Sequence, residues 1–236
     1  MEKKRKRKRN ITNLTKEQKL AFRRRQVKRQ KFLLTACGLF LVILIAALLF
    51  FILSRPKEDI LQINAACESY RDEVTTAAAK YGMSDYVDLI LAVMMQESSG
   101  QGTDVMQSAE GAYNTKYPQT PGGITDPSYS IECGIQELKY AMDKAGVKSP
   151  ADIEHIRLAL QAYNFGADVY FSFMEEQGET VWSEESAEAF AQMASGETLR
   201  AEDDPLKDPA GPWAYGDQRY PEHVLRYYHL ETQSAG

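Results

Sequence analysis

The sequence contains few of the residues that build metal sites and disulfide frameworks. Only three cysteines and three histidines occur in 236 residues, and neither set shows the close spacing of zinc ligands. The sequence also lacks a glycine-rich phosphate-binding loop, an internal repeat and an alternating apolar pattern long enough to build a sheet. We therefore expect an all-α protein that uses neither a metal nor a cofactor.

Positive charge is nearly confined to one end of the chain. Residues 1–31 contain 15 Lys and Arg against two Glu, a net charge of +13. Residues 32–236 contain 13 Lys and Arg against 31 acidic residues, a net charge of −18, and the two parts sum to −5. A split this sharp indicates two environments. Aromatic side chains that could stack on bases are almost absent from the basic part, so we expect no nucleic-acid partner.

An uncharged apolar segment follows the basic part. Residues 32–53 form 22 positions without a charge, and at about 1.5 Å per residue they can cross a hydrocarbon core of roughly 30 Å. The segment is longer than the apolar part of a secretory signal, about 7–15 residues, and no small-residue cleavage site follows it. We expect one uncleaved transmembrane helix, a cytoplasmic basic tail at 1–31 and an extracellular domain at 57–236.

The expected extracellular domain shows helical periodicity interrupted by helix breakers. The apolar spacing predicts helices over about 60–81, 86–97, 131–142, 149–173, 183–194 and 221–230. Ser84, Ser149 and Ser183 are the expected N-caps, Gly82 and Gly146 the expected helix ends, and Gly166 an expected break. Polar loops are expected at 98–127 and 197–218. Cys67 and Cys133 could form a disulfide or remain buried thiols.

Glu97 is the residue of this domain that is best suited to acid–base chemistry. Ile90, Val93, Met94 and Glu97 are spaced to share one helix face, which places a carboxyl at the end of an apolar stripe. Desolvation and the negative end of the helix dipole both favour its neutral form. A Glu that keeps its proton near neutral pH is what the general acid of a glycosidase requires. From periodicity alone, a Glu that caps its helix or faces solvent is the commoner placement.

Three short motifs give Glu97 a context. They are Gln-Glu-Ser-Ser-Gly at 96–100, Asp-Val-Met-Gln-Ser at 104–108 and Ala-Tyr-Asn-Phe-Gly at 162–166. In this order they resemble the motifs of lytic transglycosylases and goose-type lysozymes. The segment is more closely similar to the lysozyme-like domain of cell-wall hydrolases from Gram-positive conjugative elements, over about residues 60–230. The resemblance implies a lysozyme-like helical fold.

The resemblance also implies roles for individual residues. Glu97 would be the catalytic acid, cleaving the β-1,4 bond between N-acetylmuramic acid and N-acetylglucosamine in peptidoglycan. Ser98, Gln107, Tyr163 and Asn164 would bind the glycan strand. Without the resemblance, Tyr163 could be a core residue and Asn164 a helix C-cap. This chain departs from the usual Gly-Leu-Met-Gln motif, because Asp104 and Val105 replace its first two residues.

Three functions are compatible with these motifs. A muramidase needs a second carboxylate to activate water, for which Asp104 and Asp126 are candidates and Glu110 a weaker one. A lytic transglycosylase that forms 1,6-anhydro ends needs Glu97 alone, first as acid and then as base. A non-catalytic scaffold would only bind glycan strands.

The closer resemblance favours the muramidase. The presence of Glu97 with the tyrosine-asparagine motif argues against the scaffold. A protein tethered to the membrane would act on nearby peptidoglycan, which suits local opening of the wall. The expected partners are therefore glycan strands, the membrane and a secretion or conjugation machine.

Overall fold

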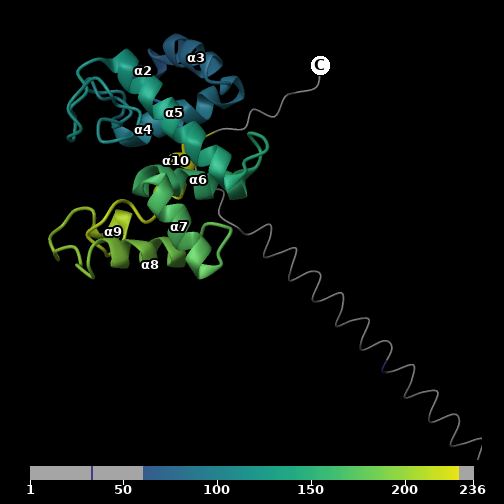
Figure 1. Ribbon diagram of the computed structural model, residues 1–236, viewed down its shortest axis with the longest axis vertical. Helices are drawn as coiled ribbons and strands as arrows, with labels where there is room; N and C mark the ends of the chain where they lie inside the picture. The colour runs from purple at the N-terminus through teal and green to yellow at the C-terminus, as the bar shows by residue number, and fades with distance from the viewer. Residues whose placement is uncertain (1–32, 34–60, 229–236) are drawn as a thin grey trace, which may run out of the picture. The chain divides into compact units, whose positions relative to one another are not determined.

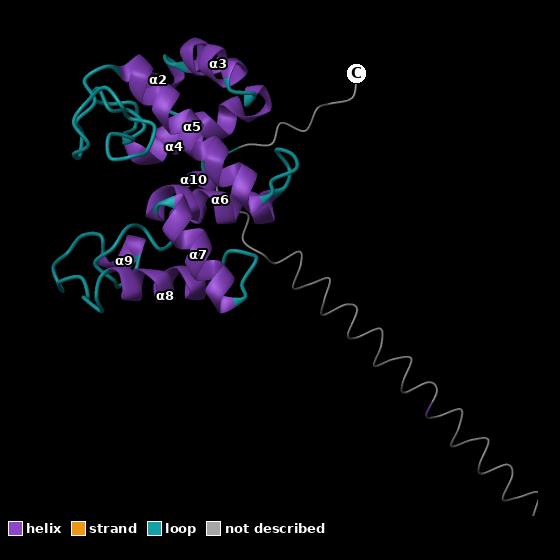
Figure 2. Ribbon diagram, in the orientation of Figure 1, coloured by secondary structure: helices purple, strands orange, loops and turns teal. Residues whose placement is uncertain are grey.

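The computed structural model describes residue 33 and residues 61–228 (Figure 1). The expected basic tail and all but one residue of the expected transmembrane helix at 32–53 lie outside the described residues. Within the described part of the chain, no helix is both long and apolar enough to cross a membrane. Residues 61–228 contain helices and loops and no strand, with one isolated bridge between Leu199 and Trp213 (Figure 2). The predicted all-α class is confirmed.

The described helices form a stack in which α10, the last helix, packs between helices from earlier in the sequence. Helices α2 to α5 occupy one end, α7 to α9 the other, and α6 and α10 lie between them (Figure 1). Their bounds are α2 Ala65–Glu68, α3 Arg71–Lys80, the 3₁₀ turn η2 Ser84–Tyr86, α4 Val87–Glu97, α5 Pro127–Ala145, α6 Ile153–Phe165, α7 Ala167–Gln177, α8 Glu184–Ala194, α9 Lys207–Ala210 and α10 Tyr220–Leu225.

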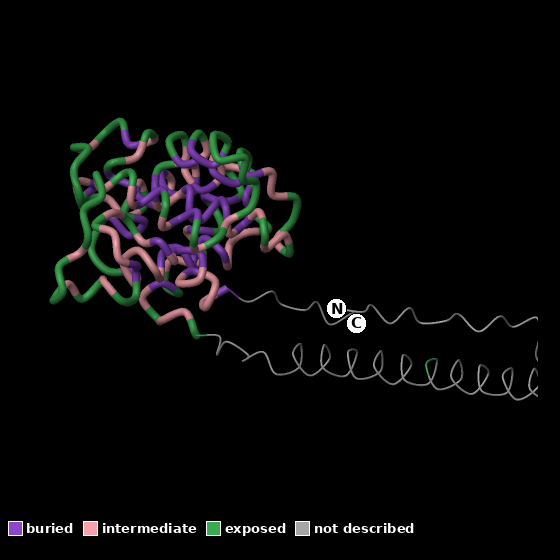
Figure 3. The backbone as a smooth tube through the Cα atoms, turned by 90° about the horizontal axis from the view of Figure 1, so that it is seen from below, coloured by how far each residue is buried: buried purple, intermediate pink, exposed green. Residues whose placement is uncertain are grey.

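Helix α4 lies inside the core. Every residue from Leu89 to Met94 is fully buried, so the helix is covered on all sides rather than along one stripe. Helices α2 and α3 pack on it, and α10 packs on both α4 and α6. Figure 3 shows this buried interior surrounded by exposed loops. A helix that is apolar all round is stable only when neighbours cover every face, and α4 leaves this covered region in its half-buried last turn, which ends at Glu97.

The expected helix over 60–81 is two helices, because its first turn closes against a distant loop. The Asn64 side chain caps α2 by accepting a bond from the Cys67 N–H at 2.8 Å, and its amide donates to the Ser99 carbonyl at 3.0 Å. Gly100 approaches so closely that a Cβ there would lie 2.7 Å from the Cys67 nitrogen. Cys67 is a buried free thiol, as is Cys133. These contacts tie α2 to the turn that follows α4.

Two predicted N-caps were wrong. Ser84 forms no cap bond and begins the turn η2, so α4 starts at Val87. The segment from Ser149 to Asp152 is a turn, and α6 starts only at Ile153. A serine or proline start signal is satisfied by a turn as well as by a helix, which explains both errors. Helix α9 was missed within the expected loop at 197–218.

Three predicted helix boundaries were correct. Gly146 ends α5 with a left-handed backbone, φ 77°. Gly166, with φ 88°, separates α6 from α7. Ser183 caps α8 in a reciprocal arrangement with Ser186. The break at Gly166 turns the chain where a cavity opens, so its conformation affects the candidate site.

Gly134 in α5 provides a test of this packing. A Cβ at position 134 would lie 2.5 Å from the Cβ of Met106, so we expect Gly134→Ala to destabilise the domain. Overpacking costs about 1–3 kcal/mol and outweighs the gain in helix propensity, which is up to about 1 kcal/mol. Urea unfolding of the purified chain followed by circular dichroism measures the change. The exposed Asp143→Ala variant is the control, and unchanged stability of Gly134→Ala would contradict the close approach.

Candidate active site

The loop between α4 and α5 is organised by Asp104. Its Oδ1 accepts bonds from the Ser108 N–H at 3.1 Å and the Ser130 hydroxyl at 2.7 Å, and its Oδ2 accepts from the Ala109 N–H at 3.1 Å. The residue is only 3% exposed. A buried carboxylate is stable when its oxygens are satisfied in this way. Asp104 thereby fixes the segment that carries Met106 and the residue after it.

Glu97, the last residue of α4, meets the first residue of α10. The Tyr220 hydroxyl donates a short hydrogen bond to Glu97 Oε1. Tyr220 is almost fully buried, and its ring stacks on Tyr163 with centroids 6.3 Å apart. The Tyr163 hydroxyl donates in turn to the Met106 carbonyl at 2.8 Å. Two tyrosines therefore link Glu97 to the loop that Asp104 organises.

Asn164 connects α6 to the segment before α10. Its Oδ1 accepts a bond from the Asp217 N–H at 2.8 Å. The Asp217 carboxylate accepts from the Arg219 N–H at 2.9 Å and lies 2.6 Å from His223 Nδ1. Asn164 is therefore not the C-cap of α6, a position held by Gly166. The bond places the Asp217 carboxylate near Glu97, whose pKa its charge raises.

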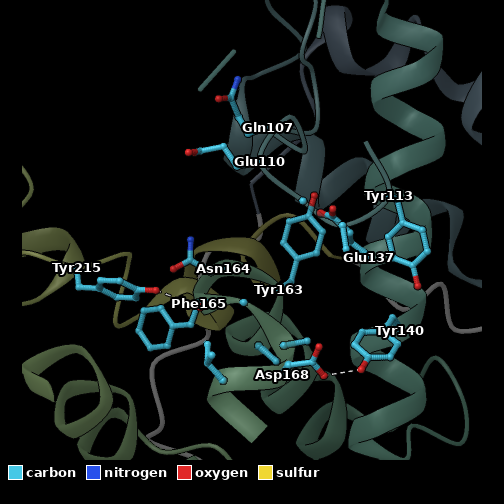
Figure 4. Close-up of a pocket in the computed structure, with 16 residues that line it drawn as sticks. Gln107, Glu110, Tyr113, Glu137, Tyr140, Tyr163, Asn164, Phe165, Asp168 and Tyr215 are labelled. Carbon is cyan, nitrogen blue, oxygen red and sulfur yellow. Dashed lines mark hydrogen bonds between the residues drawn. The ribbon is translucent and has the colours of Figure 1, made fainter. Parts of the chain in front are cut away.

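A cavity of about 550 Å³ opens beside these residues. Its walls come from the loop at 107–113, helix α5, the junction of α6 with α7, and Tyr215 (Figure 4). Carboxyl, amide and phenol groups alternate around it with apolar surface, a lining that suits a sugar, which has hydroxyls at its edge and apolar faces. The polar side chains labelled in Figure 4 are Gln107, Glu110, Tyr113, Glu137, Tyr140, Tyr163, Asn164, Asp168 and Tyr215.

Some of the candidate site residues from the sequence line the cavity, and others do not. Gln107, Tyr163 and Asn164 line it. Glu97 does not line it but is joined to Tyr163 through Tyr220. The Ser98 hydroxyl donates to the Val105 carbonyl at 2.7 Å, which holds the loop rather than facing the cavity.

The two acids suggested as partners of Glu97 have structural roles. Asp104 uses both oxygens within its loop. Asp126 caps α5 by accepting a bond from the Ser128 N–H at 3.1 Å, and it does not line the cavity. Glu110 lines the cavity from an exposed position on the loop.

The surroundings of Glu97 favour its protonated form. Burial, which removes water from the charged carboxylate, raises the pKa of Glu97 to about 7, and the negative charges of Asp104 and Asp217 act in the same direction. The hydrogen bond from Tyr220 opposes them. The carboxyl therefore exchanges its proton near neutral pH. A group of this kind can give a proton to a leaving oxygen and recover it.

Comparison with known proteins agrees with this geometry. The model of the lysozyme-like family matches residues 65–227. The bifunctional muramidase/DL-endopeptidase CwlT of Bacillus subtilis is 32% identical over 160 residues, covering 68% of this chain and 41% of CwlT. The membrane protein YocA of the same species is 34% identical over 157 residues, 66% of this chain and 65% of YocA.

A solved structure shows the same fold. A lipoprotein-like protein of the NLP/P60 family from Staphylococcus aureus superposes with a TM-score of 0.58 at 26% identity, covering 73% of this chain and 55% of that protein. The chain belongs to the lysozyme-like family. It spans about two fifths of CwlT and just under two thirds of YocA.

Three residues of this lysozyme-like site are not indicated by the sequence motifs. Nothing in the spacing of Tyr220 shows that it meets Glu97. Asp217 lies in a segment without periodicity. Glu137 had a detectable signal, because it is placed four residues after Cys133 and four before Ala141, both fully buried. An acid on the buried stripe of a helix is uncommon and indicates a functional or paired group.

The raised pKa of Glu97 makes a prediction about stability. Below pH 4.5 the carboxyl is neutral in both the folded and unfolded chains, and as pH rises towards 7 only the unfolded chain ionises freely. The wild-type domain therefore loses stability over this window, by on the order of 2–3 kcal/mol. Glu97→Gln lacks the part of the loss that comes from Glu97, so we expect it to match the wild type at pH 4 and to exceed it at pH 8.

Thermal unfolding of both proteins at the two pH values measures this difference. Glu110→Gln is the control, because the Glu110 side chain is exposed. An equal difference between wild type and Glu97→Gln at pH 4 and pH 8 would show that the folded domain does not raise the pKa of Glu97.

Proposed function

We propose that this protein is a muramidase that cleaves the β-1,4 bond between N-acetylmuramic acid and N-acetylglucosamine in peptidoglycan. The observation that carries the proposal is the environment of Glu97, a carboxyl with a pKa of about 7 beside a cavity lined by polar and aromatic groups. Membership of the lysozyme-like family supports a glycan substrate. The similarity to CwlT, whose name includes muramidase, supports this cleavage.

Each residue of the site has a role in the proposed reaction. Protonated Glu97 gives its proton to the glycosidic oxygen as the bond to C1 breaks, and Tyr220 holds the carboxyl in place. Gln107, Tyr163 and Asn164 bind the sugar from the cavity wall. Asp104 and Ser98 hold the loop that presents Gln107. Positive charge develops on the sugar ring as the bond breaks, and the negative field of the surrounding acids stabilises it.

A product analysis tests the proposal. The full chain, purified in detergent and incubated with peptidoglycan, should release muropeptides with reducing N-acetylmuramic acid ends, identified by mass spectrometry. Activity should fall as pH rises through about 7, because the proton of Glu97 is then lost. Glu97→Gln should lower the rate by at least about 10²-fold, since the amide cannot donate a proton as an acid.

The controls separate the competing functions. Glu97→Gln should still bind peptidoglycan in a pull-down assay and keep its helical circular dichroism. Products with 1,6-anhydro ends would replace the muramidase by a lytic transglycosylase. Binding without any product from the wild-type chain would replace it by a glycan-binding scaffold.

We also propose that residues 1–53 anchor the lysozyme-like domain at the outer face of the cell membrane. The basic tail at 1–31 and the uncharged segment at 32–53 support this arrangement. An anchored enzyme reaches only nearby wall, which suits local opening for a secretion or conjugation machine.

Replacing residues 1–56 by a cleavable secretory leader tests the anchor. We expect the variant to appear in the medium, to cleave isolated peptidoglycan as the wild type does, and to fail in its cellular role. Full function in cells from the secreted variant would contradict the need for an anchor.

A further inference from the structure

Gln161 is a fully buried amide in the second half of helix α6. Its side chain has no exposed surface, and it does not line the cavity. It precedes Asn164 by three residues, so the two amides share one face of the helix, on the side where α10 packs (Figure 1). A buried amide costs free energy unless its donor and its acceptor are both paired. The partners of Gln161 therefore indicate what this side chain does.

Gln161 and Asn164 hold the two peptide groups of Asp217, and we call these two residues the amide clamp. Gln161 Nε2 donates a hydrogen bond to the Asp217 carbonyl at 2.8 Å, and Asn164 Oδ1 accepts one from the Asp217 N–H at 2.8 Å. Both peptide groups of one residue are thus bonded to one helix. The segment that follows Asp217 starts from a fixed position on α6.

The backbone just before Asp217 approaches α6 so closely that only glycine fits there. Gly216 has a left-handed backbone with φ 47°. A Cβ at this position would lie 2.6 Å from the Phe165 ring and 2.8 Å from Asn164 Oδ1. The clamp bonds therefore form between a helix and a loop that are in direct contact, which leaves the loop little room to shift.

Trp182, in the loop before α8, fixes the orientation of the Gln161 amide. Its indole Nε1–H donates a hydrogen bond to Gln161 Oε1 at 3.0 Å. An indole can only donate, so the amide oxygen faces Trp182 and the amide nitrogen faces Asp217. Trp182 does not line the cavity. Its bond to Gln161 can be removed without removing the bond from Gln161 to Asp217, which provides a matched control.

We propose that Gln161 is a positioning residue that acts on Glu97 through the start of α10, a role that rests on the proposed muramidase function. The Asp217 carbonyl that Gln161 holds also accepts a bond from the Tyr220 N–H at 3.2 Å. The hydroxyl of the same tyrosine donates to Glu97 Oε1. Both partners of the Gln161 amide lie outside the cavity wall. Loss of the amide therefore displaces the acid and leaves the glycan-binding wall unchanged.

Gln161→Met tests this role, because methionine keeps the length of the side chain and removes the amide. We expect kcat on soluble glycan strands to fall about 10- to 10²-fold, since a displacement of roughly 1 Å can cost that much in rate. KM should change little, because the cavity wall is intact. Trp182→Phe removes the other bond of the same amide and should keep the wild-type kcat. Equal losses of kcat in the two variants would overturn the proposal.

The double variant Gln161→Met with Trp182→Phe separates turnover from stability. Removal of both partners of a buried hydrogen bond costs less than removal of one, so this chain should resist urea better than Gln161→Met alone. Its kcat should remain as low, because the Asp217 carbonyl still lacks the amide. Recovery of the wild-type kcat in the double variant would show that Gln161 serves only stability, and would overturn the proposal.

A second pair of variants tests the route through Tyr220. Tyr220→Phe removes the hydroxyl that bonds to Glu97. Adding Gln161→Met to Tyr220→Phe should lower kcat little further, because changes that act on the same contact are not additive. Losses that multiply in the combined variant would overturn the route through this tyrosine.

Carbon-13 NMR of labelled tyrosine reports on the same contact without any turnover. The full chain in detergent is used, and the Cζ signal of Tyr220 is assigned with Tyr220→Phe. We expect this signal to move in Gln161→Met and to stay in place in Trp182→Phe. An unmoved signal in Gln161→Met would overturn the positioning role even in an active enzyme. A moved signal in a chain whose wild type releases no product would instead overturn the muramidase and leave the positioning of Glu97 supported.

Discussion

The hydrogen bond from Tyr220 to Glu97 is the contact on which the arrangement of the site depends. It joins the end of α4 to the start of α10, which come from opposite ends of the domain sequence. Residues 89–94 of α4 are buried on every side, and the neighbours that cover this helix also desolvate the carboxyl of the half-buried Glu97 at its end. The tyrosine satisfies one oxygen of Glu97 but does not remove the cost of ionising it. The removal of water that accompanies burial is therefore also what allows Glu97 to keep its proton near neutral pH.

The remainder of the site keeps negative charge close to that carboxyl. Asp104 is buried to organise a loop, and Asp217 is held by Asn164 and His223. Both carboxylates raise the pKa of Glu97 while performing a structural task elsewhere. Residues that fix the backbone thus also raise the pKa of Glu97. An exchange such as Asp104→Asn would alter the fold of the loop and the protonation of Glu97 together, so its effect on rate could not be assigned to one cause.

The sequence predicted the parts of the structure that depend on local chemistry. Gly146, Gly166 and Ser183 end, break and cap helices as expected, because backbone conformation and capping are properties of a few adjacent residues. The division of the first expected helix could not be predicted, since it depends on contact between Asn64 and the distant Ser99. Periodicity identified Glu97 but placed it on a stripe, whereas neighbours that are remote in sequence bury the middle of α4, residues 89–94, on every side.

The same distinction applies to the site. The resemblance of the motifs predicted that Gln107, Tyr163 and Asn164 bind the glycan strand. All three line the cavity. The resemblance did not indicate Tyr220 or Glu137, because neither belongs to those motifs and each reaches the site through tertiary packing. Asp104 and Asp126 were suggested by their chemistry and position in sequence, but the hydrogen bonds that occupy them are visible only in the fold.

Direct titration of the Glu97 carboxyl tests whether the fold raises the pKa of this residue. Carbon-13 NMR of selectively labelled glutamate, assigned with Glu97→Gln, follows the carboxyl carbon as pH is varied. We expect a midpoint for Glu97 of about 7. A midpoint near the ordinary value of about 4.3 would show that the carboxyl is ionised at neutral pH, and it would contradict the role of Glu97 as the acid.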